Sequence, residues 1–158
     1  MSKLPITRYG EQQLKAELHR LKTLERPAIS AAIAEARAQG DISENAEYDA
    51  AKEKQSFVEG RILEIESKLA IAQVIDPATL DAGGRVVFGA TVEIEDTETE
   101  KRSVYQIVGD DEADLRIGKI SVSSPIARAL IGKLAGDTVE FEAPGGLREV
   151  EIISVMYL

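Results

Sequence analysis

Apolar residues in the first half of the chain recur at the spacing of helices that pack along one side. The first run comprises Leu14, Leu18, Leu21, Ile29 and Ile33, and the second comprises Val58, Ile62, Ile65, Leu69 and Ala72. The second run advances in steps of 4, 3, 4 and 3 residues, which is the seam pattern of a coiled coil. Antiparallel pairing places Ile33 opposite Val58, so the chain must fold back near residue 45. We therefore predict an antiparallel helical hairpin.

Local signals place the ends of the two helices. Thr7 is of a type that caps helix N-termini, and Pro27 interrupts the first helix, where we expect a kink or a new start. The second helix is expected to start within residues 43–45 and to run to about residue 72. About 26 residues from Leu14 to Gln39, each rising about 1.5 Å, would carry the turn roughly 39 Å from the base.

The period of the pattern changes near residue 76, and the second half is typical of strands. Segments rich in Val, Ile, Phe and Tyr alternate there with turn residues. One short helix is indicated by Ser124 as its N-cap, Pro125 at its first position and Gly132 at its end. The expected strands cover residues 85–95, 103–108, 119–122, 138–142 and 149–156.

These elements predict an α+β protein of two domains. The first is the antiparallel coiled-coil hairpin over residues 1–76, and residues 77–83 form a linker. The second, over residues 84–158, is a small sheet with one packed helix.

Composition narrows the possible functions. The chain of 158 residues has no cysteine and a single His19, which argues against a disulfide framework, a thiolate metal site or a histidine-based triad. It contains no long apolar run, so we expect a cytoplasmic protein without a membrane partner. The net charge is −9, of which residues 77–158 carry −7. Such a chain is repelled by naked DNA, and a protein with a basic surface is the more natural partner.

Two acids lie at the turn of the predicted hairpin. Asp41 and Glu44 are hard oxygen ligands three positions apart, close enough to hold one small divalent cation. A full Mg²⁺ or Ca²⁺ site needs about six oxygens, so water or another molecule would have to supply the rest. The alternative is structural, because acids near a helix start also cap free N–H groups and complement the helix dipole.

Three further residues near the turn each have two possible roles. Arg37 and Lys52 should lie at similar height on the two helices, where they could receive a phosphate backbone or form an ordinary solvated face. Tyr48 could stack on a base or cover the end of the coiled coil.

Several blocks of sequence, in order and over essentially the whole chain, resemble the bacterial Gre transcript-cleavage factors. The tip reads Gly-Asp-x-x-Glu-Asn-Ala-Glu-Tyr at residues 40–48. Several independent blocks are far more specific than any one motif. The other blocks lie at residues 32–37, 59–62, 84–92, 107–114, 120–133 and 144–146.

This resemblance implies an FKBP-like fold for the second domain and binding to bacterial RNA polymerase through its secondary channel. It implies that Asp41 and Glu44 reach the polymerase active centre and share a Mg²⁺ ion with it. Arg37 and Lys52 match basic positions near the nascent RNA 3′ end. The family often has Lys where this chain has Ser43, and Arg where it has Lys52, so the basic patch here is expected to be weaker.

The resemblance also assigns supporting and docking roles. Asn45 and Tyr48 are expected to support the tip, and the protein is expected to be a monomer. The charge of the second half and its helix start indicate that this half binds the polymerase. The docking residues expected there are Ser124, Pro125, Ile126 and Ala127.

Three rival interpretations stay open. An inhibitory paralogue would occupy the same channel and block catalysis, although the intact acid pair argues against it. A prolyl isomerase is suggested by the FKBP-like fold, but the second half offers Phe88, Tyr105, Phe141 and Tyr157 and no Trp to floor a proline pocket. A plain coiled-coil adaptor would not depend on the charge of the tip.

Overall fold

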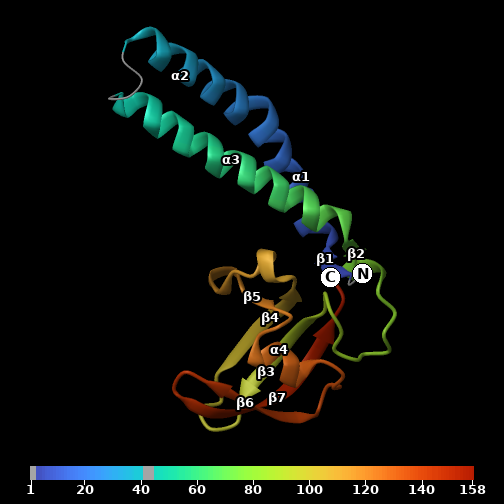
Figure 1. Ribbon diagram of the computed structural model, residues 1–158. Coiled ribbons are helices and arrows are strands. Elements are labelled where there is room, and N and C mark those ends of the chain that lie inside the picture. Colours follow the sequence, from blue (N-terminus) through green and yellow to red (C-terminus); the bar gives the residue numbers. More distant parts are fainter. Residues whose placement is uncertain (1–2, 41–44) are drawn as a thin grey trace. The chain divides into compact units, whose positions relative to one another are not determined.

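The computed structural model describes residues 3–40 and 45–158 and divides them into two compact units. One unit is formed by Glu11–Ile71. The other combines the segment up to Gly10 with Ala72–Leu158. A helical region and a separate curled sheet confirm the predicted α+β class (Figure 1). Within the described ranges, no helix is long and apolar enough to cross a membrane.

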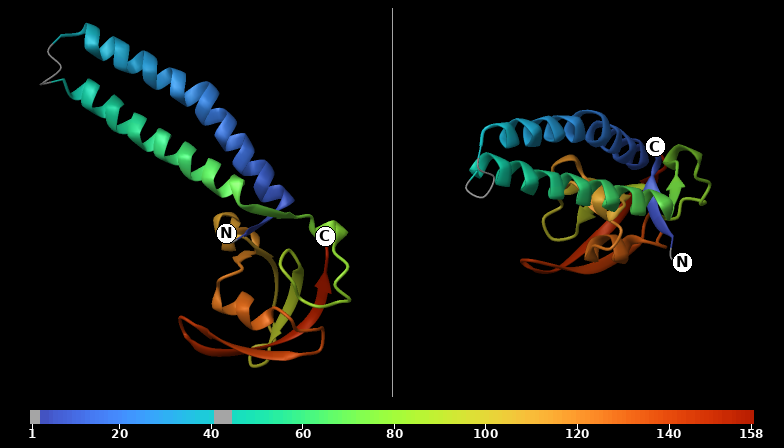
Figure 2. Two further views of the ribbon diagram at one scale, coloured as in Figure 1. Left: turned by 45° about the vertical axis from the view of Figure 1, so that its right-hand side comes forward. Right: turned by 45° about the horizontal axis from the view of Figure 1, so that its top comes forward.

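The first unit is the predicted antiparallel hairpin. Its first arm runs through α1 (Arg8–Arg20), the π-helical segment η1 (Leu21–Glu25) and α2 (Arg26–Ala38), and its second arm is α3 (Ala46–Ala70). The arms lie side by side in every view (Figures 1 and 2). Most of the predicted seam is buried, while Leu18 and Leu69 are half-buried. The buried seam residues are Leu14, Leu21, Ile29, Ile33, Ala36, Val58, Ile62 and Ile65.

The interruption expected at Pro27 takes the form of a π-helical turn. The N–H of Arg26 donates to the carbonyl of Leu21, five residues back, and α2 then starts with Pro27 in its first turn. Proline has no N–H and its ring clashes with the carbonyl four residues earlier, so an α-helix cannot pass through it unchanged. The wider turn keeps the first arm helical while changing the hydrogen-bond pattern just before the proline.

Ion pairs join the two arms outside the apolar seam. Arg61 donates twice to the carboxylate of Glu17, at 2.7 and 2.8 Å, and Arg26 donates twice to Glu59, at 2.9 and 2.8 Å. The hydrogen bonds from Arg61 lower the pKa of Glu17 below its usual value. Such pairs favour one alignment of the arms, because a slipped register would bring different charges together.

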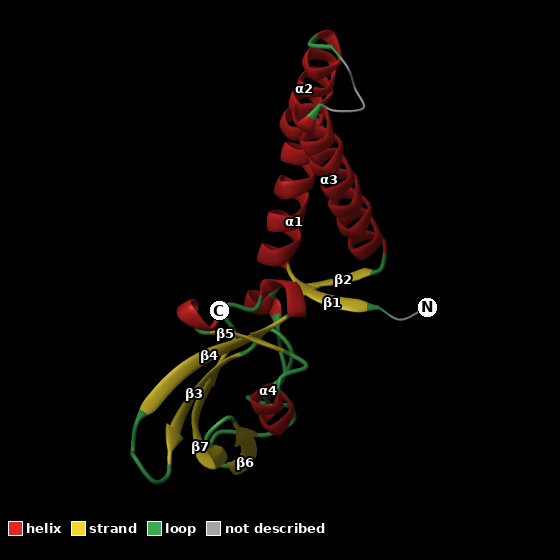
Figure 3. Ribbon diagram, turned by 60° about the vertical axis from the view of Figure 1, so that its left-hand side comes forward, coloured by secondary structure: helices red, strands yellow, loops and turns green. Residues whose placement is uncertain are grey.

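The second unit is a curled five-stranded sheet with one helix packed on it (Figure 3). The strand order is β5-β4-β3-β7-β6, and every neighbouring pair is antiparallel except β4 and β5. Helix α4 (Pro125–Leu130) has Ser124 as its N-cap, as predicted, and ends before Ile131. The strands are β3 (Thr91–Asp96), β4 (Arg102–Val108), β5 (Lys119–Ser121), β6 (Thr138–Ala143) and β7 (Gly146–Met156).

The core of this unit lies between the sheet and α4. Its members are aliphatic apart from one phenylalanine, and most are completely shielded from solvent. Short 3₁₀ turns connect the strands: η3 (Pro77–Thr79), η4 (Asp110–Glu112) and η5 (Leu115–Ile117). The buried core comprises Val86, Ala90, Val92, Ile94, Ile107, Ile120, Ala127, Leu130, Val139, Phe141, Val150 and Ile152.

Two strands were not predicted. β1 (Leu4–Thr7) pairs in parallel with β2 (Ala72–Ile75), with Leu4 opposite Ala72. This pairing ends α3 at Ala70, so Ala72 lies in a strand and its assignment to the coiled-coil seam was wrong. It also places the segment up to Gly10 and residues 72–76, which we expected in the first domain, in the second unit.

The prediction of a strand over residues 85–95 was wrong for its first half. Strand β3 begins at Thr91, and Gly89 adopts a left-handed backbone conformation with φ of +90°. Val86 is completely buried, and its N–H donates to the carbonyl of Lys133. Next to it, Arg85 forms an isolated antiparallel bridge with Leu134, so this segment is buried and paired at one point without forming a strand.

Candidate functional site at the hairpin turn

The two acids of the predicted cation site, Asp41 and Glu44, lie outside the described residues. The structure describes the residues on either side of them. Helix α2 reaches its C-cap at Gln39, and α3 starts after Asn45, whose extended backbone and side chain form the N-cap that the sequence predicted within residues 43–45. The ends of the connection that carries the acids are thus defined.

Asn45 joins the two helices with one side chain. Its amide oxygen accepts a hydrogen bond from the N–H of Tyr48 at 3.0 Å, which caps α3. Its amide nitrogen donates to the carbonyl of Ala36 at 2.7 Å, in the last turn of α2. The N–H of Tyr48 lies in the first turn of α3, where donors have no partner within the helix, and the carbonyl of Ala36 also accepts from the N–H of Gln39. One asparagine thus caps α3 and adds a second donor to the end of α2.

A second contact crosses the hairpin beside Asn45. The guanidinium of Arg37 lies over the ring of Tyr48, 5.8 Å from its centroid. Such a contact contributes about 0.5–1 kcal/mol at an exposed site. Arg37 is exposed and Tyr48 is half-buried, so the ring contacts the arginine while part of it faces solvent.

Lys52 lies one helical turn beyond Tyr48 on α3. It is exposed, and its ammonium donates to the side chain of Gln55 at 2.9 Å. The structure thus brings Arg37, Asn45 and Tyr48 together, with Lys52 on the neighbouring turn of the same helix.

The described part of the chain holds no group of three or more His, Cys, Asp or Glu side chains that could bind a metal ion. The sequence pair of Asp41 and Glu44 supplies only oxygen donors, which suits Mg²⁺. Two carboxylates leave most of an octahedral shell to other molecules, so this chain alone fits a shared ion and not a resident one.

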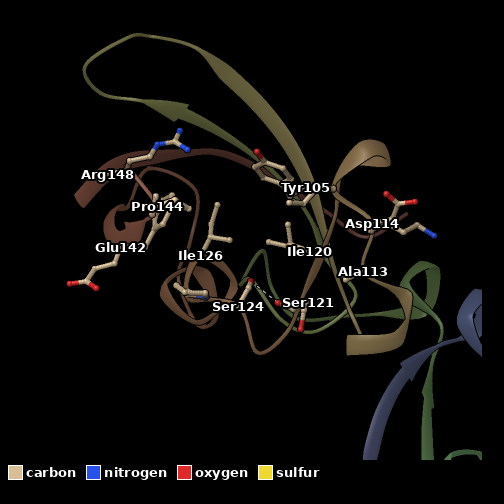
Figure 4. Close-up of a pocket in the computed structure, with 15 residues that line it drawn as sticks. Tyr105, Ala113, Asp114, Ile120, Ser121, Ser124, Ile126, Glu142, Pro144 and Arg148 are labelled. Carbon is tan, nitrogen blue, oxygen red and sulfur yellow. Dashed lines mark hydrogen bonds between the residues drawn. The ribbon is translucent and has the colours of Figure 1, made fainter. Parts of the chain in front are cut away.

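The predicted docking residues border a cavity in the second unit. The cavity measures about 590 Å³ and opens between β4, β5, α4 and the β6–β7 hairpin (Figure 4). Ser124, Pro125 and Ile126 line it, and Ser124 is held by a hydrogen bond to the carbonyl of Ser121 at 2.7 Å. Ala127 does not belong to this surface. It is completely buried in the core, so its assignment to a docking site was wrong.

The rest of the cavity combines an apolar floor with a charged rim. Tyr105 and Phe141, two of the aromatic residues considered above, line it, whereas Phe88 and Tyr157 pack against the core. On the rim, the guanidinium of Arg116 hydrogen-bonds Asp114 and lowers the pKa of that carboxyl below its usual value. Further lining residues, to which the sequence analysis gave no docking role, are Leu115, Ile120, Ala143, Pro144 and Arg148.

Comparisons with known proteins agree with this architecture. The family model of the transcription elongation factor N-terminal domain, GreA/GreB, matches residues 4–74, and the GreA/GreB C-terminal model matches residues 81–157. The transcription elongation factor GreA of Ralstonia nicotianae is 70% identical over 158 residues, covering 100% of both chains. The GreA of Neisseria meningitidis serogroup B is 59% identical, again over 100% of both chains.

Solved structures of similar proteins include two that align along nearly the whole chain. GreA factor homolog 1 (Gfh1) of Thermus thermophilus is 27% identical, with a TM-score of 0.44, and the match covers 98% of this chain and 99% of that one. A GreA/GreB factor from Nitrosomonas europaea is 24% identical, with a TM-score of 0.43, covering 98% and 100%. The two family models and the identity over full length establish that this chain belongs to the GreA/GreB family of transcription elongation factors.

Proposed function

We propose that this protein rescues backtracked bacterial RNA polymerase by stimulating cleavage of the nascent RNA at the polymerase's own active centre. The helical hairpin would enter the secondary channel, and the second unit would bind outside it. Membership of the GreA/GreB family and the acid pair in the hairpin turn support this proposal. Hydrolysis removes the displaced 3′ end, after which elongation resumes.

The acids of the turn act as ligands of a metal site that is shared with the polymerase. Asp41 and Glu44 offer carboxylate oxygens to a Mg²⁺ ion that the polymerase also binds. When bound there, the metal supplies the usual chemistry of two-metal hydrolysis, activation of water and stabilisation of the leaving oxygen. Asn45 fixes the ends of the connection that carries the acids, because it ties the carbonyl of Ala36 to the start of α3.

The basic residues beside the turn hold the RNA. Arg37 and Lys52 are both exposed, so their charges are available to phosphate oxygens. The ring of Tyr48 keeps the guanidinium of Arg37 at the end of the hairpin. Lys52 offers a point charge rather than a bidentate fork and contributes less directional grip.

The cavity of the second unit supplies the docking surface. Its apolar floor, which includes Ile126 and Tyr105, suits an aliphatic side chain of a protein partner, and its rim carries charges of both signs. Docking through this unit raises the effective concentration of the hairpin turn at the polymerase channel.

The observation that carries the proposal is the acid pair Asp41 and Glu44 in a chain of the GreA/GreB family, in the connection that Asn45 closes with two hydrogen bonds. The test is to incubate purified, backtracked polymerase with this protein and Mg²⁺ and to measure release of 3′-terminal RNA fragments. Release is expected with the wild type and is expected to be lost in Asp41→Ala and Glu44→Ala, while both variants still compete with the wild type for polymerase.

The rival functions predict different outcomes of the same experiment. Binding with inhibition of intrinsic cleavage would identify an inhibitory paralogue. Binding by the wild type without any stimulation of cleavage, unchanged by substitution of the tip acids, would identify an adaptor. Turnover of a proline peptide without any effect on cleavage would identify a prolyl isomerase.

A further inference from the structure

Residues 107–114 form one of the blocks that resemble the Gre factors, and within this block the proposed function gives no role to Glu112. In the structure the block forms the end of β4 and the turn η4, which contains Glu112. The side chain of Glu112 reaches the opposite end of the chain, 105 positions away in sequence. This contact lies entirely within the second unit, because that unit includes the segment up to Gly10.

The carboxylate of Glu112 accepts three hydrogen bonds. One oxygen accepts from the N–H of Thr7 at 3.0 Å and from the N–H of Gly109 at 3.0 Å. The other accepts from the hydroxyl of Thr7. That hydroxyl in turn accepts from the N–H of Gly10 at 3.1 Å, so the cap of α1 and the carboxylate belong to one chain of hydrogen bonds. We call these four residues, Thr7, Gly10, Gly109 and Glu112, the Glu112 clasp.

Both glycines of the clasp are required by it. A Cβ atom on Gly10 would overlap the carboxyl group of Glu112, and one on Gly109 would lie 2.9 Å from the carbonyl of Pro5 and 3.1 Å from Glu112. Glycine within a helix is unfavourable by about 0.5–1 kcal/mol relative to alanine. The presence of Gly10 in the first turn of α1 is explained by the room that it leaves for the carboxylate.

The surrounding contacts hold the same segment. Ile6 is buried, with 3% of its surface exposed, and the ammonium of Lys119 lies over the ring of Tyr9 at 4.1 Å. The parallel pair β1–β2 has only four residues in each strand, and a two-stranded sheet of that size is marginal alone. The clasp adds a charged hydrogen-bond acceptor to these contacts.

We propose that Glu112 is a positioning residue that fixes the start of the hairpin's first helix to the polymerase-docking unit. The hydrogen bonds of the clasp do not depend on the proposed function, but their effect on cleavage rests on it, because there docking delivers the hairpin turn to its target. It predicts that breaking the clasp leaves docking intact and lowers the rate of cleavage, because misplacement of reacting groups by about 1 Å can cost about 100-fold.

The first test measures amide hydrogen exchange by NMR in the free, full-length protein. Glu112→Ala is expected to lower protection of the Thr7 and Gly109 amides by about tenfold or more, since both lose a charged acceptor. Glu112→Gln, which keeps one acceptor oxygen, should lose less. Glu140→Ala removes an equal charge from the exposed face of the same unit and should change neither amide. Unchanged protection in Glu112→Ala, or an equal loss at the core amide of Ile152, would overturn the clasp.

Combining Gly10→Ala with Glu112→Ala tests whether these two residues of the clasp act together. Gly10→Ala is expected to lower the protection of the Thr7 amide in the wild-type background, because the added methyl group meets Glu112. In the Glu112→Ala background the same change should be neutral or favourable, since the methyl group then has room. Equal effects in both backgrounds would show that the two residues do not act together.

The second test separates docking from delivery on backtracked polymerase. Glu112→Ala should compete for polymerase as well as the wild type, yet its cleavage rate at saturating concentration should fall about tenfold or more. Glu112→Gln should recover part of that rate. A wild-type rate in Glu112→Ala, or a loss of docking that accounts for the whole effect, would overturn the positioning role. Absence of cleavage with the wild-type protein would overturn the proposed function and this role together, while hydrogen exchange still decides whether the clasp exists.

Discussion

Replacement of Asn45 should open the end of the hairpin without unfolding the rest of the protein. Asn45→Ala removes the N-cap bond to the Tyr48 N–H, which contributes about 1 kcal/mol, and the bond to the Ala36 carbonyl, which contributes a similar amount. Together these losses of about 2 kcal/mol raise the local opening constant about 30-fold. The seam itself is unchanged, because Val58 and Ile33 lie further along the hairpin.

Asn45→Asp separates the two bonds. Aspartate is as good an N-cap as asparagine, and its charge is favourable at the start of α3, but it has no N–H to donate to Ala36. We expect Asn45→Asp to lose about 1 kcal/mol, which raises the local opening constant about fivefold. This variant should therefore lie between the wild type and Asn45→Ala. Asn45→Ser is the uncharged control, because it also caps α3 and is too short to bridge to α2.

Hydrogen exchange at the Tyr48 amide measures this opening directly. A local probe is needed because a protein of two units need not unfold in one step. Stimulated cleavage should fall in the same order, from wild type through Asn45→Asp to Asn45→Ala. Equal protection of the Tyr48 amide in the wild type and Asn45→Ala would refute the bridging role. A loss that spread equally to amides near Ile65 would show a general effect on the hairpin instead.

The remaining predictions concern charge. Asp41→Asn should be nearly as inactive in cleavage as Asp41→Ala, because hard-cation binding depends on the charge of the ligand, and near-normal activity would exclude the metal role. Replacing Arg37 and Lys52 together with Ala should weaken cleavage most at high salt, since fewer phosphate contacts remain, whereas loss of binding to polymerase without RNA would assign them to the protein interface. Arg61→Met should destabilise the hairpin by about 1 kcal/mol at neutral pH, as judged by amide exchange in α3. The pKa of Glu17 is lowered in the folded state, so this stabilisation is present above its usual pKa of 4.5 and is lost as the pH falls through the lower folded value, where wild type and variant should converge.

Helices and caps that depend on residues close together in the sequence could be predicted from the sequence. The alternation of steps of 3 and 4 from Val58 to Leu69 depends only on helix geometry, and the structure buries most of that seam. The cap at Asn45 and the start at Ser124-Pro125 follow from the chemistry of single side chains. Each of these signals lies within one or two turns of the residues that it organises.

Contacts between distant segments could not be predicted in this way. Ala72 continued the heptad pattern of α3, and only its parallel partner, 68 positions earlier, shows that it belongs to a strand. Val86 has a strand-forming side chain, but it lies in an irregular segment that is held by backbone hydrogen bonds to Gly132 and Lys133. For the site, the sequence indicated Arg37 and Tyr48 separately, and the structure adds that one lies over the other.

The placement of both strands in the second unit changes how the two proposed tasks of the protein, docking and delivery of the hairpin turn, are divided along the chain. With a boundary at residue 76, each domain would be built from continuous sequence. A linker would then join the domain expected to dock to the domain expected to deliver the acids. Instead, the segment that enters the hairpin and the segment that leaves it pair with each other as β1 and β2, and Glu112 holds the first of them. Removing residues 1–76 would therefore expose the surface that covers Ile6 and leave the carboxylate of Glu112 without its Thr7 donors. The segments that lead into and out of the hairpin therefore belong to the second unit, and a cut at residue 76 would remove part of that unit.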